Sequence, residues 1–376
     1  MYRITRHTLK IVAYMLGLIF FLSVPSSFAQ RLIIHVKQTD NTLDIQANFA
    51  YETKNYTIPE HIAVIQKLET IYYLLEHQQR EIRTLDKVSQ FVERQYKTIQ
   101  RQGKTIWGYI KQWSFKPKKE ATANHAPTNN EIKVLLTEVG QSLYHPVQSF
   151  IELASAIEFV ITEECLLYPF DATYYKGTPL FLHKPIIYSF KRQYDSPLKV
   201  SKDWKGFMIS DRSTDPERGL LLVKELFPRS RYFDSHDVHP EELQQMERAD
   251  FVLISANGGV QGMDLPHCAI RSKNLSHMQA KLVYLNSCQL GLRLDFIYSL
   301  HQAGTLYYIA PILSNEAGES STKTMERFFR ALLNGETPSY ALYLTRKTLY
   351  HLYADQDNEF CRVMWRTFPF RVYRLN

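Results

Sequence analysis

Residues 252–262 read VLISANGGVQG, and residues 282–291 read LVYLNSCQLG. Each stretch is a nearly continuous apolar run that stops at small and polar residues. Apolar runs of this kind are typical of parallel strands that helices cover on both faces. The two stretches therefore predict neighbouring strands of one sheet, with Asn257 at the end of the first strand and Cys288 at the end of the second.

The rest of the chain from residue 131 onward also alternates between strand and helix patterns. The clearest segments are GFMISD (206–211), PERGLLLVKELF (216–227), SRYFD (230–234), LDFIYSLHQAG (294–304) and TLYYIAPI (305–312). This alternation predicts an α/β fold, a three-layer αβα sandwich with a mostly parallel sheet. Functional residues of such sheets gather at the carboxyl ends of adjacent strands, where Asn257 and Cys288 are expected.

The N-terminal part of the chain has a different pattern and predicts a separate organisation. Residues 31–58 alternate apolar and polar residues around a Thr-Asp-Asn turn, which predicts a β-hairpin with a possible third strand. Residues 114–130, SFKPKKEATANHAPTNN, combine prolines, lysines and small polar residues and predict a linker. We therefore expect an N-terminal region at 30–113, a linker at 114–130 and a larger domain at 131–376.

Residues 60–112 predict a long helix or helical hairpin. Apolar residues recur there with a seven-residue spacing at Leu68, Ile71, Leu75, Ile82, Leu85, Val92 and Ile99. Between residues 60 and 119 there are twelve Lys and Arg residues against six Asp and Glu residues. Two interpretations are open: a solvated basic face, or a surface for self-association, a coiled-coil partner or an acidic partner.

The first 29 residues predict a signal peptide. A basic start is followed by fourteen uncharged, mostly apolar residues at 11–24 and by the small residues Ser27 and Ala29. Fourteen helical residues span only ~21 Å, which is short of a ~30 Å hydrocarbon core. We expect cleavage near Ala29 and export to the periplasm or the extracellular space, with a retained membrane anchor as the alternative. No other segment predicts a contact with the membrane.

The composition narrows the classes of function. The formal net charge is +7, and the three basic residues of the signal segment leave the remaining chain with +4. That charge is too small, without a concentrated patch, to predict nucleic-acid binding. No phosphate-binding glycine motif occurs, so no nucleotide cofactor is expected. The four cysteines have neither the spacing of a metal site nor the density of a disulfide scaffold, so no metal is expected and any disulfide pairing is open.

Four stretches, in order, resemble the CHAT domain, a caspase-like, tetratricopeptide-repeat-associated domain related to caspases, separases and gingipains. They are AIEFVITEECLLYPFDATYYKGTPLFLHKPIIYSF (156–190), ADFVLISANGG (249–259), LVYLNSCQLG (282–291), and HQAGTLYYIAPI with TMERFFRALLNGETPSYAL (301–312 and 324–342). The resemblance covers residues 131–376 and implies a caspase-like fold. The region before it lacks the usual repeat array.

The resemblance implies roles for three residues. Cys288 matches the nucleophile that attacks a peptide carbonyl, and Gly258 matches the glycine whose backbone N–H helps to bind the oxyanion. Asn257 stands where the family has its catalytic histidine. Histidine can accept a thiol proton and return it to the leaving amine near neutral pH, whereas an asparagine amide does neither. General acid–base help is typically worth ~10²–10⁴-fold, so the departure predicts impaired hydrolysis.

Alternatives remain for the individual residues. His267 lies in the connection between the two strands and is the best candidate for a substitute base. Cys288 can instead be a small residue that packs at a strand end. Asp171, in the matching motif Tyr-Pro-Phe-Asp-Ala, is either a specificity residue for a basic side chain or the anchor of a turn.

Whether the chain is an enzyme is therefore open at this point. The favoured hypothesis is a degenerate cysteine peptidase that binds a peptide or a protein partner. An active endopeptidase that uses Cys288 with a relocated base such as His267 is the alternative. A third hypothesis places partner binding on residues 60–112, with the larger domain as a scaffold.

Overall fold

The computed structural model describes residues 30–39, 42–58, 64, 66–76, 129–191, 198–259, 262–356 and 359–376. The predicted signal peptide, most of the predicted helix at 60–112 and nearly all of the predicted linker lie outside these residues.

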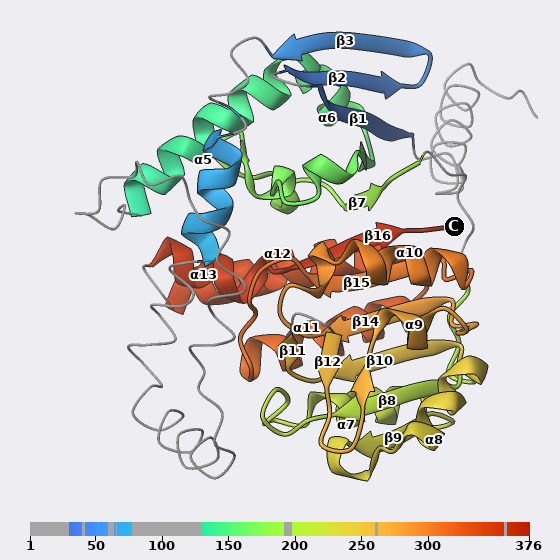
Figure 1. The fold of residues 1–376 in the computed structure, drawn as a ribbon. Helices are drawn as coiled ribbons and strands as arrows, with labels where there is room; N and C mark the ends of the chain where they lie inside the picture. The colour runs from blue at the N-terminus through green and yellow to red at the C-terminus, as the bar shows by residue number, and fades with distance from the viewer. Residues whose placement is uncertain are drawn as a thin grey trace, which may run out of the picture.

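One large sheet organises the described chain (Figure 1). In spatial order its eleven strands are β3 (Glu52–Ile58), β2 (Thr42–Phe49), β1 (Arg31–Thr39), β4 (Ala156–Ile161), β7 (Ile186–Ser189), β16 (Phe370–Arg374), β15 (Tyr307–Pro311), β14 (Leu282–Asn286), β10 (Phe251–Ser255), β8 (Gly206–Ser210) and β9 (Arg231–Asp234). Seven of the ten neighbouring pairs are parallel, so the predicted mixed α/β fold with a mostly parallel sheet is confirmed.

Nine of the eleven strands form two parallel blocks that run in opposite directions. Strands β15, β14, β10, β8 and β9 are parallel to one another, and β1, β4, β7 and β16 form the other block. The blocks meet where β16, the last strand of the chain, pairs antiparallel with β15. The carboxyl ends of β8, β10, β14 and β15 therefore share one edge, as the sequence predicted for the candidate site.

Helices cover both faces of the sheet because its strands are apolar at consecutive positions. One face packs its side chains, such as Leu253 and Tyr284, against α7 (Gly219–Leu226), α11 (Glu319–Leu333) and α12 (Pro338–Gln356). The other face, with Ile254 and Leu285, packs against α9 (Ser272–Leu275) and α10 (Leu294–Gln302). This alternation gives the two hydrophobic cores of a three-layer sandwich.

The remaining elements are short or lie at the ends of the sandwich. They are α5 (Asn129–Tyr144), α6 (Gln148–Leu153), α8 (Pro240–Leu243), α13 (Phe360–Thr367), the hairpin β5 (Tyr174–Tyr175) and β6 (Thr178–Pro179), and the small sheet β11 (Gly258–Gly259), β12 (Gly262–Asp264) and β13 (Ala269–Ile270). Single 3-10 turns occur at His145–Val147, Glu163–Cys165, Phe170–Ala172, Leu180–Leu182, Ser235–Asp237, Gln244–Arg248 and Leu290–Leu292.

The N-terminal strands belong to the central sheet. The predicted hairpin and third strand are β1, β2 and β3, and β1 pairs in parallel with β4 over residues 31–36. The sequence placed this hairpin in a region before the linker, whereas its strands extend the sheet of the larger domain. Residues 66–76 are helical. Their apolar side chains Leu68, Ile71 and Leu75 are buried in the same core as β1 and β4.

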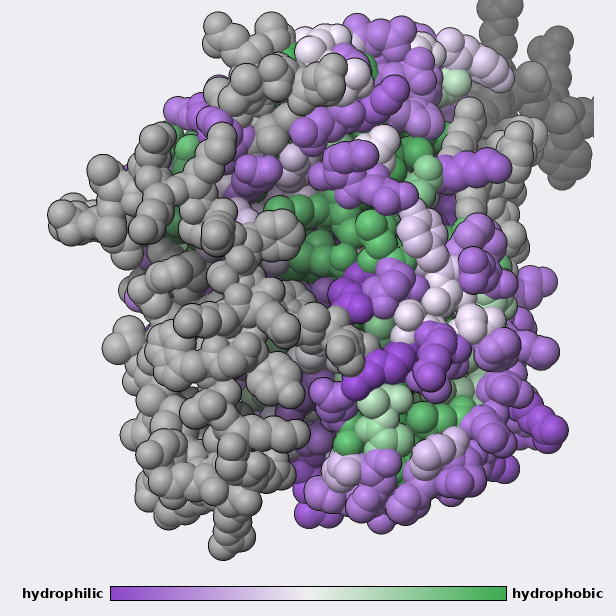
Figure 2. Space-filling model, in the orientation of Figure 1, coloured by the Kyte–Doolittle hydropathy of each residue, from purple (hydrophilic) through white to green (hydrophobic). Residues whose placement is uncertain are grey.

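The surface of the described chain is largely hydrophilic in the view of Figure 2, with hydrophobic residues visible near the centre of this face. Among the helices of the described residues, none combines the length and the apolar character that crossing a membrane requires.

Candidate functional site

The ends of β10 and β14 bring the two predicted site residues to the same edge of the sheet. In the parallel register Ser255 is opposite Asn286, so Asn257 and Cys288 each follow two residues later. The backbone approaches closely there: a Cβ atom built on Gly258 would lie 2.8 Å from the carbonyl oxygen of Cys288. The predicted juxtaposition of these two strand ends is therefore present.

Close packing explains the glycine at position 258. The same Cβ atom would also lie 2.7 Å from Oγ of Ser287, a side chain that is itself buried. Real Cβ atoms essentially never come this close to a backbone oxygen. Any side chain at position 258 would therefore force one of the two strand ends to shift. Gly258 thus permits the turn from β10 into the small sheet to pass directly over the chain at Cys288.

We expect Gly258→Ala to destabilise the protein by ~1–3 kcal/mol, because the added methyl group overpacks the contact with Ser287 and Cys288. Gly259→Ala is the matched control, since its Cβ atom would meet nothing closer than 3.5 Å. Chemical denaturation of both variants measures the difference. Equal stability of the two variants would show that the strand ends relax freely.

The thiol of Cys288 is oriented by a chain of amide side chains. Its Sγ donates a hydrogen bond to Oδ1 of Asn315, at 3.5 Å, and Asn315 lies in the loop after β15. The Asn315 amide donates in turn to Oδ1 of Asn286 at 2.6 Å, and the Asn286 amide donates to Oγ of Ser255 at 2.8 Å. Asn286, Ser255 and Asn315 are all buried, so this network is part of the interior and holds Asn315 in place.

Asn257 is exposed and is held by a second polar chain. Its amide Nδ2 donates to Oγ of Ser213 at 2.9 Å, and the Ser213 hydroxyl donates to Oδ1 of Asp211 at 2.6 Å. Asp211 directly follows β8, the neighbour of β10. A carboxylate, a hydroxyl and the side chain at position 257 therefore stand in series, and the carboxylate orients the other two.

His267, the predicted substitute base, lies in the turn between β12 and β13, where Leu265 N–H donates to the carbonyl of Cys268. Its ring stacks on the ring of His239, with centroids 4.7 Å apart, and His239 immediately precedes α8. Both side chains are exposed. The ring of His267 therefore stacks at the N-terminal end of α8, and its role as a substitute base stays a prediction.

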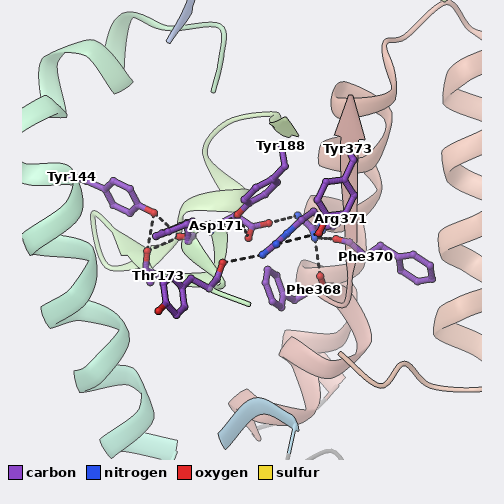
Figure 3. Close-up of polar contacts among 11 residues, drawn as sticks. Tyr144, Asp171, Thr173, Tyr188, Phe368, Phe370, Arg371 and Tyr373 are labelled. Carbon is purple, nitrogen blue, oxygen red and sulfur yellow. Dashed lines mark hydrogen bonds and ion pairs between the residues drawn. The ribbon is translucent and has the colours of Figure 1, made fainter. Parts of the chain in front are cut away.

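Asp171 is buried in an ionic cluster at the 3-10 turn Phe170–Ala172 (Figure 3). Its side chain is 1% exposed, and its Oδ2 lies 2.9 Å from Nη1 of Arg346, which belongs to α12. Its Oδ1 accepts a hydrogen bond from the Tyr188 hydroxyl at 2.8 Å. Both carboxylate oxygens of Asp171 are bound by groups inside the protein. These contacts support the anchor of a turn over a specificity residue for a basic side chain of a ligand.

The four cysteines do not form disulfides. Burial raises the pKa of the Cys165 thiol to about 11 and that of the Cys361 thiol to about 12. Burial also raises the pKa of Cys268. Because the thiolate is the reactive form, the raised pKa should slow the reaction of these three side chains with electrophiles. Cys165 and Cys361 are also buried, whereas Cys268 and Cys288 are partly exposed.

Several residues of the site were not identified from the sequence. Asn286, Asn315, Ser213 and Asp211 form the two polar chains, and each follows or ends an apolar strand segment. Their position as polar residues at strand ends could have indicated a site. Polar residues are also common in ordinary turns, so this position alone did not distinguish them. Among the described residues no group of three His, Cys, Asp or Glu side chains gathers in a way that could hold a metal ion.

Neither a scan against protein-family models nor a search of curated proteins finds a match to this chain.

Proposed function

We propose that this protein is an exported, caspase-like domain whose cysteine site has lost efficient hydrolysis and binds a peptide or a protein partner at the strand ends around Cys288. The observation that carries the proposal is that amide side chains occupy this edge. The Cys288 thiol donates to the amide oxygen of Asn315, and Asn257 follows the neighbouring strand β10 at the position that matches Cys288 after β14.

Neither amide can do the proton transfers of a cysteine peptidase. An amide oxygen accepts a hydrogen bond but does not take up a proton near neutral pH, so the contact with Asn315 orients the thiol without forming the thiolate. The Asn257 amide cannot protonate a leaving amine either. The loss of general acid–base help alone lowers the rate by ~10²–10⁴-fold.

The strand-end edge nevertheless keeps features that suit binding. Gly258 leaves the backbone beside Cys288 uncovered by a side chain, and Asn257 presents an exposed amide that can both donate and accept hydrogen bonds. An extended peptide recognised through its backbone needs groups of this kind. Binding without turnover is therefore the function that the side chains present can best support.

The test compares the mature wild-type protein with Cys288→Ala against a peptide library. We expect no cleavage in the wild type beyond that of the variant, because the acid–base partner of Cys288 is missing. The same library, read by affinity capture, should yield bound peptides that an alkylated Cys288 no longer retains. Cleavage that disappears in Cys288→Ala and in His267→Ala would instead establish an active peptidase with a relocated base and overturn the proposal.

A further inference from the structure

The helical residues 66–76 contact the chain on both sides of the Cys288 site. In Figure 1 this segment, drawn in blue, lies beside α5 and reaches toward α13. Its apolar side chains are buried in the core of the same chain. These positions of the predicted apolar repeat are therefore used within the molecule, and the polar residues of the segment determine what else it contacts.

Glu76 places a carboxylate in a site formed by Ser314. The Glu76 side chain is buried, its Oε2 accepts the backbone N–H of Ser314 at 2.7 Å, and its Oε1 accepts the Ser314 hydroxyl at 2.6 Å. The carbonyl of Ser314 is held from the other side, where it accepts the indole N–H of Trp365 in α13 at 3.1 Å. Burying a carboxylate is costly unless donors meet it, and here one residue offers two that converge on the two oxygens.

The position of Ser314 connects this carboxylate to the candidate site. Ser314 immediately precedes Asn315, whose side-chain oxygen accepts the Cys288 thiol. On the other side, Nε2 of Gln289 donates to the Tyr72 hydroxyl at 3.3 Å, and Gln289 immediately follows Cys288. Gln289 has a left-handed backbone (φ 59°), so its side chain is held in an unusual direction toward the helix. Tyr72 and Glu76, one helical turn apart, thus bracket Cys288.

We propose that Ser314 forms a carboxylate-binding subsite of the Cys288 edge, and that Glu76 of this chain is its internal occupant. The proposal rests on the proposed peptide-binding function. A peptide ligand of this edge would present an acidic side chain to Ser314 and would displace the Glu76 carboxylate. In the conformation described here the chain therefore covers its own binding edge. The class of ligand is an acidic peptide segment.

The first test measures how accessible Cys288 is. Wild type, Glu76→Ala and Tyr72→Phe are treated with iodoacetamide, and peptide mapping gives the rate of alkylation at each cysteine. We expect Glu76→Ala to raise the rate at Cys288 by about tenfold, because losing a charged hydrogen bond favours local opening of the segment. Tyr72→Phe should raise the rate by a smaller factor. Glu69→Ala and Tyr73→Phe are the matched controls on the same helix, and both should leave the rate unchanged.

The buried thiols Cys165 and Cys361 report on global unfolding in the same experiment. If Glu76→Ala makes them reactive too, Ser314→Ala is used as the test variant instead of Glu76→Ala. It is the milder change, because it removes the hydroxyl that donates to Glu76 and keeps the backbone N–H donor. An unchanged rate at Cys288 in an otherwise folded variant would overturn the proposal.

The second test asks whether the vacated subsite recognises a carboxylate. Sodium propionate supplies the group that Glu76→Ala lacks, propionamide is its neutral isostere, and sodium chloride controls for ionic strength. Propionate should slow the alkylation of Cys288 in Glu76→Ala back toward the wild-type rate, and propionamide should not. Equal effects of the two compounds would refute a carboxylate subsite. These readouts do not depend on peptide cleavage, so an unexpectedly active wild-type enzyme would overturn the proposed function and leave this result interpretable.

Discussion

Arg346→Met should lower the free energy of unfolding by ~3–5 kcal/mol, because it leaves the Asp171 carboxylate buried without its cation. The side chains of Arg346 and Asp171 are 4% and 1% exposed, and their nearest N and O atoms are 2.9 Å apart. Water cannot replace the lost partner at this depth. Burial already acts to lower the pKa of Arg346, and Asp171 counteracts that shift, so each charge depends on the other.

The neighbours of Arg346 add to the expected loss. Its Nη2 donates to the carbonyl oxygens of Phe368 and Phe370, which link the end of α13 to the start of β16. Its guanidinium also lies 5.2 Å from the ring centroids of Phe181 and Phe368. Removing the guanidinium therefore leaves the carbonyl oxygens of Phe368 and Phe370, both labelled in Figure 3, without this donor. These contacts join residues from distant parts of the chain, so the whole region should weaken.

Urea denaturation of Arg346→Met, Asp171→Asn and the double variant measures this effect. The two changes should be non-additive, with a coupling of ~0.5–3 kcal/mol, because each single variant already disrupts the same pair. Glu326→Ala is the control, since its i,i+4 pair with Arg330 is half exposed and should be worth only about 0.3–0.5 kcal/mol. A loss in Arg346→Met no larger than that of the control would mean that water reaches the pair.

The elements that local patterns predict well are those on which the candidate site is built. The strands before Asn257 and Cys288 are apolar at every position up to Ser255 and Asn286, and such runs depend on burial of the segment itself rather than on any particular neighbour. Their shared edge then follows from the parallel arrangement. For this reason the sequence was sufficient to place these two residues together, although it could not supply the distance between their side chains.

The last strand, β16, was missed because its sequence does not look buried. Arg371 and Arg374 are both 1% exposed, at positions where a charge normally indicates the surface. Arg371 donates to the carbonyl oxygens of Leu166 and Tyr168, and Arg374 pairs with Glu158 on β4. These partners lie some 200 residues away along the chain, so no local pattern reveals that the charges are satisfied. The reversal of the sheet at β16 was hidden for the same reason.

The same limit applies within the site. Asn315 and Cys288 are separated by 27 residues and by α10 and β15, and Glu76 meets Ser314 across 238 residues. A polar residue at the end of a predicted strand can be assigned to the edge of the sheet from the local sequence. Its hydrogen-bond partner cannot, because that partner depends on how several elements pack. The asparagine at position 257 was informative only because the resemblance implied a different residue there.

Asn257→His should produce peptide cleavage that depends on Cys288, with a rate gain of ~10²–10⁴-fold over the wild type. This position follows β10 as Cys288 follows the neighbouring strand β14, so an imidazole here would be at the same edge of the sheet as the thiol. The position is exposed, so the larger ring has room. The Ser213 hydroxyl, which donates to Asp211 at 2.6 Å, now accepts a hydrogen bond from the Asn257 amide. In the variant it would accept one from the imidazole N–H instead. The Ser213 hydroxyl, itself held by the carboxylate, would then orient the imidazole as the third group of a triad does, with the imidazole as the base.

Two features of the result separate a restored mechanism from a trivial one. The rate should rise with pH through the ordinary histidine range near ~6.5, because the base must be neutral to take the thiol proton. Asn257→Gln, which lacks a titratable group, should stay inactive, and Asn257→His combined with Cys288→Ala should lose all of the gain. A different outcome is that Asn257→His folds normally and alkylates faster at Cys288 without cleaving any peptide. That outcome would mean that the thiolate forms but the oxyanion is not stabilised. The departure from an active peptidase would then extend beyond position 257 to the backbone at Gly258. If the single substitution does restore cleavage, the wild-type protein retains every other part of the machinery, and a peptide bound at this edge is held in a site that needs only a proton acceptor to cut it.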